Sequence, residues 1–302
     1  MGSPGFCIPS FEGILEAGYT VPAVVTVPDR QKGRGLKVQG SEVKKFALEK
    51  GIEVLQTLNF LEEQFINRLK ELKPDIFVII AFRILPREIF SIPASGSINL
   101  HGSLLPKYRG AAPVPRAIIN GETETGLTTF FLDDNVDTGN IILQKKIEIG
   151  PDETHGELYD RMATEGTVLV LQTIELIING TYNLIPQENS LATKAPKIFK
   201  KDCEIKWGNK SQELHNLIRG LSPHPGAYTH LNNKIIKIIR TKLTDMKTDS
   251  KPGIIMISNG SLFAAAGDNM IEITELQPEG KKPIKAKDFL NGLKSFSNLI
   301  FT

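Results

Sequence analysis

Asn99 and His101 lie two residues apart at the end of an apolar run, directly before the segment 103–106. In a β-strand, residues i and i+2 point to the same face, so we expect both side chains side by side where a strand gives way to a loop. Open α/β sheets bind their ligands at such strand ends. Asn99 can donate an amide N–H, and His101 can exchange a proton near neutral pH. This pair could therefore stabilise an oxyanion and move a proton.

A third residue, Asp137, lies in the glycine-containing stretch 135–141 between two predicted strands. An aspartate beside a histidine fixes its tautomer and stabilises its charged form. The three residues together would supply what acyl transfer needs. No G-x-S-x-G motif accompanies them, so direct attack by an external amine is favoured over a covalent enzyme intermediate. The competing interpretation is that His101 is a hydrogen-bonded structural residue and that Asp137 only stabilises the turn in which it lies.

The elements that must position these residues alternate between strand and helix over the first 180 residues. Apolar runs bounded by chain-breaking residues predict buried strands such as 74–82, and alternating polarity at 140–149 is typical of a half-exposed antiparallel strand. Helical periodicity predicts helices at 41–51 and 153–180. We therefore expect an α/β, Rossmann-like catalytic domain over 1–183, with a mostly parallel sheet and helices on both faces.

The remainder of the chain has a different pattern and a different charge. Residues 184–202 hold two prolines and four lysines with little periodicity, which indicates a linker. Short strands spaced by Asn, Gly and Asp predict a small β-barrel (OB-like) domain over 203–302. Residues 1–186 carry 18 Lys and Arg against 23 Asp and Glu, and residues 187–302 carry 18 against 11, so the net charges are −5 and +7. A basic C-terminal third indicates a polyanionic partner or a lysine-rich solvated surface.

The bulk composition excludes several classes of protein. A chain of 302 residues is long enough for two domains, and 40% hydrophobic and 23% charged residues are ordinary for a globular protein. No apolar stretch approaches the ~18 residues that a membrane-spanning helix needs, so no membrane association is expected. Cys7 and Cys203 fit neither a disulfide framework nor a zinc site, which favours a reducing, cytoplasmic setting without a bound metal.

The motifs around Asn99 and Asp137 also carry a family resemblance. The stretches INLHGSLLPKYRGAAPV at 98–114 and GLTTFFLDDNVDTGNI at 126–141 resemble the folate-dependent formyltransferases. The likeness continues through PDRQKGRG, ATKAPKIFKKDCEIKW and IRGLSPHPGAY, and so covers nearly the whole chain. The long form of this family implies formyl transfer from 10-formyltetrahydrofolate to the amino group of initiator methionyl-tRNA for translation initiation. A monomer without a metal is expected.

The resemblance assigns roles to individual residues. In the family the strand-end Asn and His and the loop Asp are catalytic, which corresponds to Asn99, His101 and Asp137. The reduced-folate site corresponds to the SLLP element, which consists of Ser103, Leu104, Leu105 and Pro106. The cations that face the tRNA correspond to Arg30, Lys32, Arg34 and Lys37 in a glycine-containing loop and to Lys197 in the linker. The segment AFRILP at 81–86 is one residue shorter than the family form, which implies altered local folate contacts.

Two groups of alternatives stay open at this point. The same chemistry could serve glycinamide ribonucleotide, a sugar nucleotide or water as the acceptor, although a basic C-terminal domain argues against a small acceptor. A non-catalytic tRNA- or folate-binding protein is a different class that fits the same motifs.

The first residues raise a separate expectation about the sheet. A doubly wound sheet begins with a strand near its centre, but residues 1–6 read as the turn that would follow such a strand. We therefore expect Met1 to be an internal methionine of the natural protein, preceded by a short apolar strand.

Overall fold

The computed structural model describes residues 1–32, 37–292 and 299–302. These residues form two compact units, called here the N-terminal unit and the C-terminal unit. The N-terminal unit comprises Met1–Pro113, Thr125–Ile147 and Tyr159–Ala195, and the C-terminal unit comprises Val114–Glu124, Glu148–Leu158 and Pro196–Thr302. Two segments of the first half of the chain therefore group with the C-terminal unit. The domain boundaries expected from the sequence, with a linker over 184–202 between the two domains, stay a prediction.

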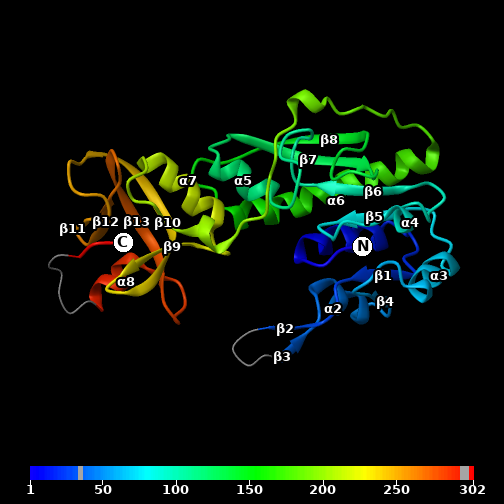
Figure 1. Ribbon diagram of the computed structural model, residues 1–302, viewed down its shortest axis with the longest axis horizontal. Coiled ribbons are helices and arrows are strands. Elements are labelled where there is room, and N and C mark those ends of the chain that lie inside the picture. Colours follow the sequence, from blue (N-terminus) through cyan, green and yellow to red (C-terminus); the bar gives the residue numbers. More distant parts are fainter. Residues whose placement is uncertain (33–36, 293–298) are drawn as a thin grey trace. The chain divides into compact units, whose positions relative to one another are not determined.

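Among its described residues, the N-terminal unit contains a four-stranded sheet and two separate pairs of strands. β5 (Phe77–Ile80), β6 (Ser97–His101), β7 (Glu124–Phe131) and β8 (Ile141–Glu148) follow one another in that order across a four-stranded sheet (Figure 1). β5 and β6 are parallel, whereas β6 and β7 are antiparallel. β1 (Ala23–Thr26) and β4 (Glu53–Gln56) form a separate parallel pair. The expected α/β class is confirmed. The parallel pairs are β1 with β4 and β5 with β6, and the sheet becomes antiparallel from β6 to β7.

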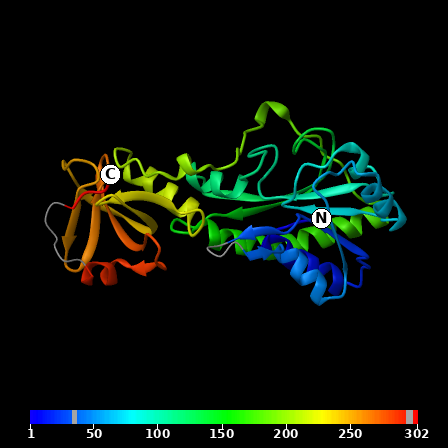
Figure 2. The same ribbon diagram turned by 60° about the horizontal axis from the view of Figure 1, so that its bottom comes forward.

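Helices cover both faces of these strands. The long helix α6 (His155–Asn179) lies along one face (Figure 2), where Gly166 meets Leu100 of β6 and Leu127 of β7. Its boundaries agree with the expected helix at 153–180. On the other face, Leu69 and Ile89 pack with β5 in one buried cluster. The remaining elements of this unit are η1 (Gly5–Cys7), α1 (Ile8–Glu16), β2 (Arg30–Lys32), β3 (Lys37–Gln39), α2 (Glu42–Glu49), α3 (Glu63–Glu71), α4 (Arg87–Phe90) and η2 (Asn189–Leu191).

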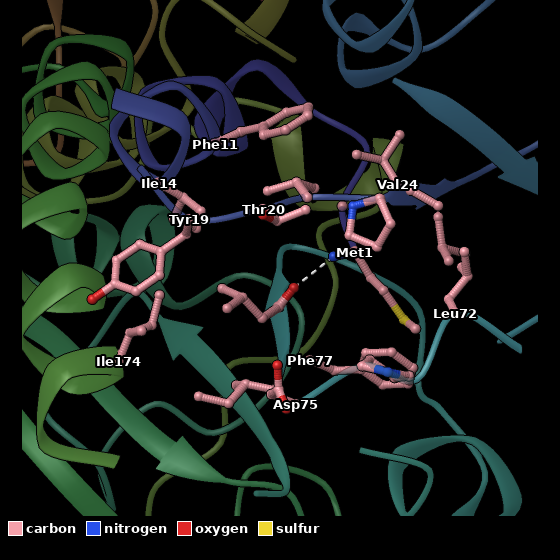
Figure 3. A pocket seen from close by; sticks show the side chains of 18 of the residues that line it. Met1, Phe11, Ile14, Tyr19, Thr20, Val24, Leu72, Asp75, Phe77 and Ile174 are labelled. Carbon is pink, nitrogen blue, oxygen red and sulfur yellow. Dashed lines mark hydrogen bonds between the residues drawn. The ribbon is translucent and has the colours of Figure 1, made fainter. Parts of the chain in front are cut away.

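A cavity of about 810 Å³ separates β1 from β5 (Figure 3). At one end of it Met1 and Gly2 bond to both strands: Gly2 N donates to Val25 O at 3.1 Å and Ile80 N donates to Met1 O at 2.9 Å. Because N–H and C=O groups alternate along a strand, the N–H of Val25 points into the cavity, as does that of Val78. Asn99, His101 and Asp137 do not line this cavity. Its shape therefore fits a strand between β1 and β5 rather than the chemistry expected at β6.

The C-terminal unit is built around an antiparallel sheet. Its strands lie in the order β11-β12-β13-β10-β9, and β14 pairs with β13. They are β9 (Ala227–Leu231), β10 (Lys234–Lys247), β11 (Ile255–Ser258), β12 (Ser261–Ala265), β13 (Asn269–Pro278) and β14 (Ile284–Lys285). The helical elements of this unit are α5 (Pro113–Ile119), η3 (Lys200–Cys203), α7 (Ser211–Leu221) and α8 (Ala286–Asn291). Trp207 stacks on Phe301 inside the core, with ring centroids 5.2 Å apart.

The expected β-sheet domain is confirmed, but its closure into a barrel is not. β9 and β11 are the edges of the sheet and do not pair with each other. The segment 299–302 bonds near both edges instead: Ile255 N donates to Leu299 O at 3.0 Å, and His230 N donates to Thr302 O at 2.8 Å. Within the described parts of the chain, no helix combines the length and apolar character needed to span a membrane.

The cavity between β1 and β5 leads to a prediction about stability. Extending the chain before Met1 by Val-Ile-Val-Ile-Val should add a strand there, because the extension satisfies inward-facing N–H and C=O groups that cost about 1–3 kcal/mol each when buried unpaired. After the entropy of ordering the strand is subtracted, we expect a gain of at least about 2 kcal/mol, measured as a rise in Tm by calorimetry. An extension of equal length with alternating prolines, which cannot donate to the strand ladder, is the control. Equal Tm values for the two extended chains would contradict the prediction.

Candidate active site

The strand β6 places Asn99 and His101 on one face. Asn99 lies opposite Ile79 of β5 and Phe130 of β7, so it is paired on both sides. Leu100, between the two polar residues, points to the face covered by α6. The two-residue spacing therefore directs both polar side chains to the face opposite α6, as the sequence predicted. β6 ends at His101, and residues 102–112 follow without regular structure except for turns.

The imidazole of His101 is nearly buried and has a defined partner on each side. Nε2 lies 2.9 Å from the carbonyl oxygen of Tyr108, and Nδ1 lies 3.7 Å from Oδ2 of Asp137. A carbonyl can only accept, so the hydrogen bond to Tyr108 requires the proton on Nε2. Nδ1 is then the nitrogen that can take up a second proton, and it faces a carboxylate. The exposed fractions of the two side chains, 6% and 11%, mean that solvent screens this pair little.

Asp137 adopts an unusual backbone conformation that is held from two sides. Its φ of 55° is left-handed, a region that Asp tolerates better than most residues. Its Oδ2 accepts a hydrogen bond from Gly110 N at 2.8 Å, which connects it to the loop after β6. Gln187 Nε2 donates to the carbonyl oxygens of Asp137 and Gly139, at 3.0 and 2.8 Å. The side chain of Asp137 is thus aimed at His101 by contacts from distant parts of the chain.

Arg109 and Gln187 are positioning residues that the sequence analysis missed. Arg109 donates from Nε and Nη2 to Gln187 Oε1, at 3.0 and 2.7 Å, and so orients the amide that holds the turn of Asp137. Arg109 begins the stretch RGAAP at 109–113, which is part of the sequence that carries the family resemblance. That stretch could have indicated a role for Arg109. Gln187 lies in the expected linker, where no local pattern distinguishes it from its neighbours.

Asn99 has an unused polar atom. Its Oδ1 is buried and has no hydrogen-bond partner. A buried polar atom without a partner costs about 1–3 kcal/mol, and the amide can turn to present its N–H₂ instead. Asn99 thus keeps hydrogen-bonding capacity that no described residue uses, in the position expected for an oxyanion donor.

The segment 103–106 is fastened to β7 and β8 by the hydroxyl of Thr128. Thr128 Oγ1 donates to Ser103 O at 2.7 Å and accepts from Leu105 N at 3.2 Å and from Gln144 Nε2 at 3.0 Å. Ser103 and Leu105 are buried in these contacts, and Leu104 and Pro106 are half-buried. The last two are the members of the expected folate segment that keep surface for a ligand.

The shortened segment 81–86 is anchored by Arg83. Its guanidinium lies 4.2 Å from the centroid of the Phe60 ring and donates to the carbonyl oxygen of Thr57 at 2.6 Å. Burial lowers the pKa of Arg83, and the positive charge of Arg30 adds to this effect. The long side chain thus connects the segment to the turn before α3.

The expected tRNA-facing cations lie in both units. Arg30 is exposed on β2, and Lys32 and Lys37 are paired residues of β2 and β3. Lys197 is exposed in the C-terminal unit, with Nζ 5.9 Å from the ring centroid of Phe199. Arg34 lies outside the described residues. In the parts of the chain that the structure covers, no group of three or more His, Cys, Asp or Glu side chains could hold a metal ion.

Comparison with known proteins gives matches to both units. The family model described as formyl transferase matches residues 14–174, and that of formyl transferase, C-terminal domain, matches 197–294. A methionyl-tRNA formyltransferase from Porphyromonas gingivalis is 44% identical over 310 residues, which cover 99% of this chain and 96% of that protein. One from Moorella thermoacetica is 42% identical, with 97% and 94% covered. Among solved structures, the N-formyltransferase from Helicobacter canadensis, in complex with folinic acid and dTDP-3-aminofucose, has a TM-score of 0.68 and 27% identity over 90% of this chain and 97% of its own.

The geometry of the loop predicts the effect of removing one hydroxyl. Thr128→Val keeps the volume but removes the hydrogen-bond partner of Ser103 O and Leu105 N, each worth about 1–3 kcal/mol when buried unpaired. We expect urea unfolding to show a loss of at least about 2 kcal/mol. Thr164→Val removes an exposed helical hydroxyl and serves as the control, with an expected change within about 0.5 kcal/mol. Similar losses in both variants would show that the hydroxyl of Thr128 does not hold the loop.

Proposed function

Since this chain belongs to the formyl transferase family, we propose that it transfers a formyl group from 10-formyltetrahydrofolate to the amino group of initiator methionyl-tRNA, for translation initiation. The observation that carries the chemistry is the pair of His101 Nδ1 and Asp137 Oδ2 on the strand face shared with Asn99, whose Oδ1 has no hydrogen-bond partner among the described residues. The choice of acceptor rests on relatives that match the chain over nearly its full length and are named for it. The basic C-terminal third of the chain supports a polyanionic acceptor.

The reaction forms a bond between the amine nitrogen and the formyl carbon and breaks the bond between that carbon and N10 of the folate. The neutral amine attacks, and negative charge develops on the formyl oxygen. The amide N–H₂ of Asn99 stabilises this oxyanion as a hydrogen-bond donor, worth about 3 kcal/mol, and the positive charge of the protonated His101 adds to that stabilisation. The amine loses a proton and the leaving folate nitrogen gains one, and His101 exchanges these protons, with water assisting.

Asp137 acts on His101 by charge and by position. When Nδ1 takes up a proton, the carboxylate 3.7 Å away stabilises the imidazolium that forms. Gln187 and Arg109 keep that carboxylate in place through the backbone of the turn. The three catalytic residues are thus Asn99, His101 and Asp137, and the other two are positioning residues.

The reduced folate is assigned to the loop after β6. A planar pterin requires an apolar surface with a few polar groups. The half-buried Leu104 and Pro106 supply apolar surface, and Ser103 and Leu105 fix the loop through Thr128. Structures in the comparison that contain folinic acid belong to proteins of the same fold.

The acceptor tRNA is assigned to cations of both units. Arg30, Lys32, Arg34 and Lys37 would contact it from the N-terminal unit, and Lys197 from the linker. We assign tRNA binding to an OB-like barrel over 203–302, joined to the catalytic domain over 1–183 by the linker 184–202. The bonds of segment 299–302 near both sheet edges support that barrel. The proposal includes a monomer that works in the cytoplasm, where the two cysteines stay reduced; both are free and buried.

A second acceptor class is an amino sugar nucleotide, as bound by the Helicobacter canadensis N-formyltransferase. Its support is the likeness of that structure, at 27% identity. The full-length relatives at 42–44% identity favour the tRNA. Turnover of methionyl-tRNA, with dTDP-3-aminofucose as the competing acceptor, separates the two.

Removing either member of the acid–base pair should abolish most turnover. We expect His101→Ala and Asp137→Ala each to lower kcat about 10²–10⁴-fold, the usual effect of general acid–base help. Binding of the folate and the tRNA, measured separately by titration, should stay near that of the unchanged protein. His224→Ala, which removes an exposed histidine, is the control. A near-normal rate in His101→Ala would rule out the mechanism.

Arg30 gives a prediction about salt dependence. If its guanidinium contacts a tRNA phosphate, Arg30→Ala should weaken binding and reduce the slope of log affinity against log salt by roughly 0.7–0.9. The measurement is tRNA binding at several salt concentrations, with the exposed Lys70→Ala as the control. An unchanged slope would remove Arg30 from the tRNA contact surface.

A further inference from the structure

A second, smaller cavity lies in the C-terminal unit and is lined by none of the residues assigned to catalysis. It has a volume of about 340 Å³ and lies between the segment 198–203 and the strands β9 and β10. Its lining includes the aromatic rings of Phe199 and Tyr228, the lysines Lys200 and Lys237, and the buried Cys203. Apolar and cationic side chains thus surround one cavity.

Phe199 is held in an exposed position by its backbone. Asp202 Oδ2 accepts a hydrogen bond from Phe199 N at 3.0 Å and forms an ion pair with Arg116 at 3.3 Å. These contacts fix the chain at the start of η3, while the side chain stays 55% exposed. A phenylalanine exposed to this extent gains little from folding, so its aromatic face is available to a ligand.

Three lysines around the cavity keep their charge available. Lys237 Nζ donates to Pro225 O at 2.6 Å, which holds this cation at the rim. Lys197 Nζ lies 5.9 Å from the ring centroid of Phe199, and Lys200 is exposed at the start of η3. Among the ion pairs of the described residues, none involves any of these three lysines. The site therefore combines an aromatic face with three lysines that form no ion pair in the described part of the chain.

We propose that this cavity binds one unstacked nucleotide of the tRNA, with its base against Phe199 and its flanking phosphates facing Lys197, Lys200 and Lys237. A planar ring bearing negative charge on one side is the ligand that matches both features. Bases inside an RNA helix do not present their faces to a protein, so the nucleotide comes from a single-stranded part of the tRNA. An acidic peptide would use the lysines but leave the aromatic ring without a planar partner. This inference rests on the proposed function for its choice of tRNA.

The test compares substitutions that remove the aromatic face with ones that remove charge. Phe199→Ala should weaken binding of deacylated initiator tRNA roughly 5- to 150-fold, the range for loss of one stacked base, with the salt slope unchanged. Phe199→Trp should restore the affinity, because it restores a ring. Lys237→Ala should reduce the salt slope by roughly 0.7–0.9. Leu243→Ala removes another exposed apolar side chain of the same unit and should bind as the unchanged protein does.

Two further measurements make the result decisive. The effect of Phe199→Ala should persist with a single-stranded oligoadenylate and vanish with double-stranded RNA of equal length, and hexaglutamate should not compete. Unchanged tRNA affinity in Phe199→Ala, an equal effect on double-stranded RNA, or competition by hexaglutamate would each overturn the inference. Turnover of methionyl-tRNA by the unchanged protein tests the proposed function separately. If the protein does not turn over methionyl-tRNA but Phe199→Ala still weakens tRNA binding, the nucleotide site is supported and the proposed function is refuted.

Discussion

The hydrogen bond between His101 Nε2 and the carbonyl oxygen of Tyr108 decides what the rest of the site can do. Because a carbonyl cannot donate, the bond assigns the proton of the neutral imidazole to Nε2 and leaves Nδ1 facing Asp137. The bond also closes the loop after β6 back onto the end of its own strand. Gly110, whose N–H donates to the Asp137 carboxylate, lies two residues beyond Tyr108 in the same loop. This contact thus sets the tautomer and ties His101 to the loop that binds Asp137.

The surrounding structure keeps this arrangement rigid. The hydroxyl of Thr128 binds Ser103 O and Leu105 N of the loop after β6. The amide of Gln187 donates to two carbonyl oxygens in the left-handed turn of Asp137. Such a turn costs energy in isolation and persists where neighbouring contacts over-determine it. Asn99 is the exception, because its buried oxygen has no partner. A rigid frame around one unsatisfied amide is what preorganised stabilisation of a developing charge requires.

The polar cluster of the candidate active site and the most basic part of the chain lie in different stretches of the sequence. The N-terminal unit holds the polar cluster at the end of β6, and residues 187–302 carry a net charge of +7. The nucleotide site that we propose there uses the exposed ring of Phe199 and the half-buried Lys237.

The sequence by itself determined the elements and the strand-end pair. Apolar periodicity located α6 and β5, and the spacing of Asn99 and His101 placed both on one face, because strand and helix periods are local properties. Tertiary structure alone decided how those elements come together: the cavity between β1 and β5, the segment 299–302 at the sheet edges, and the grouping of residues 114–124 and 148–158 with the C-terminal unit. It also decided the support of Asp137, since Gln187 is 50 residues away from it and 78 from Arg109. Hydrogen bonds between such distant residues leave no pattern in the neighbouring sequence, so folding in three dimensions has to bring them together.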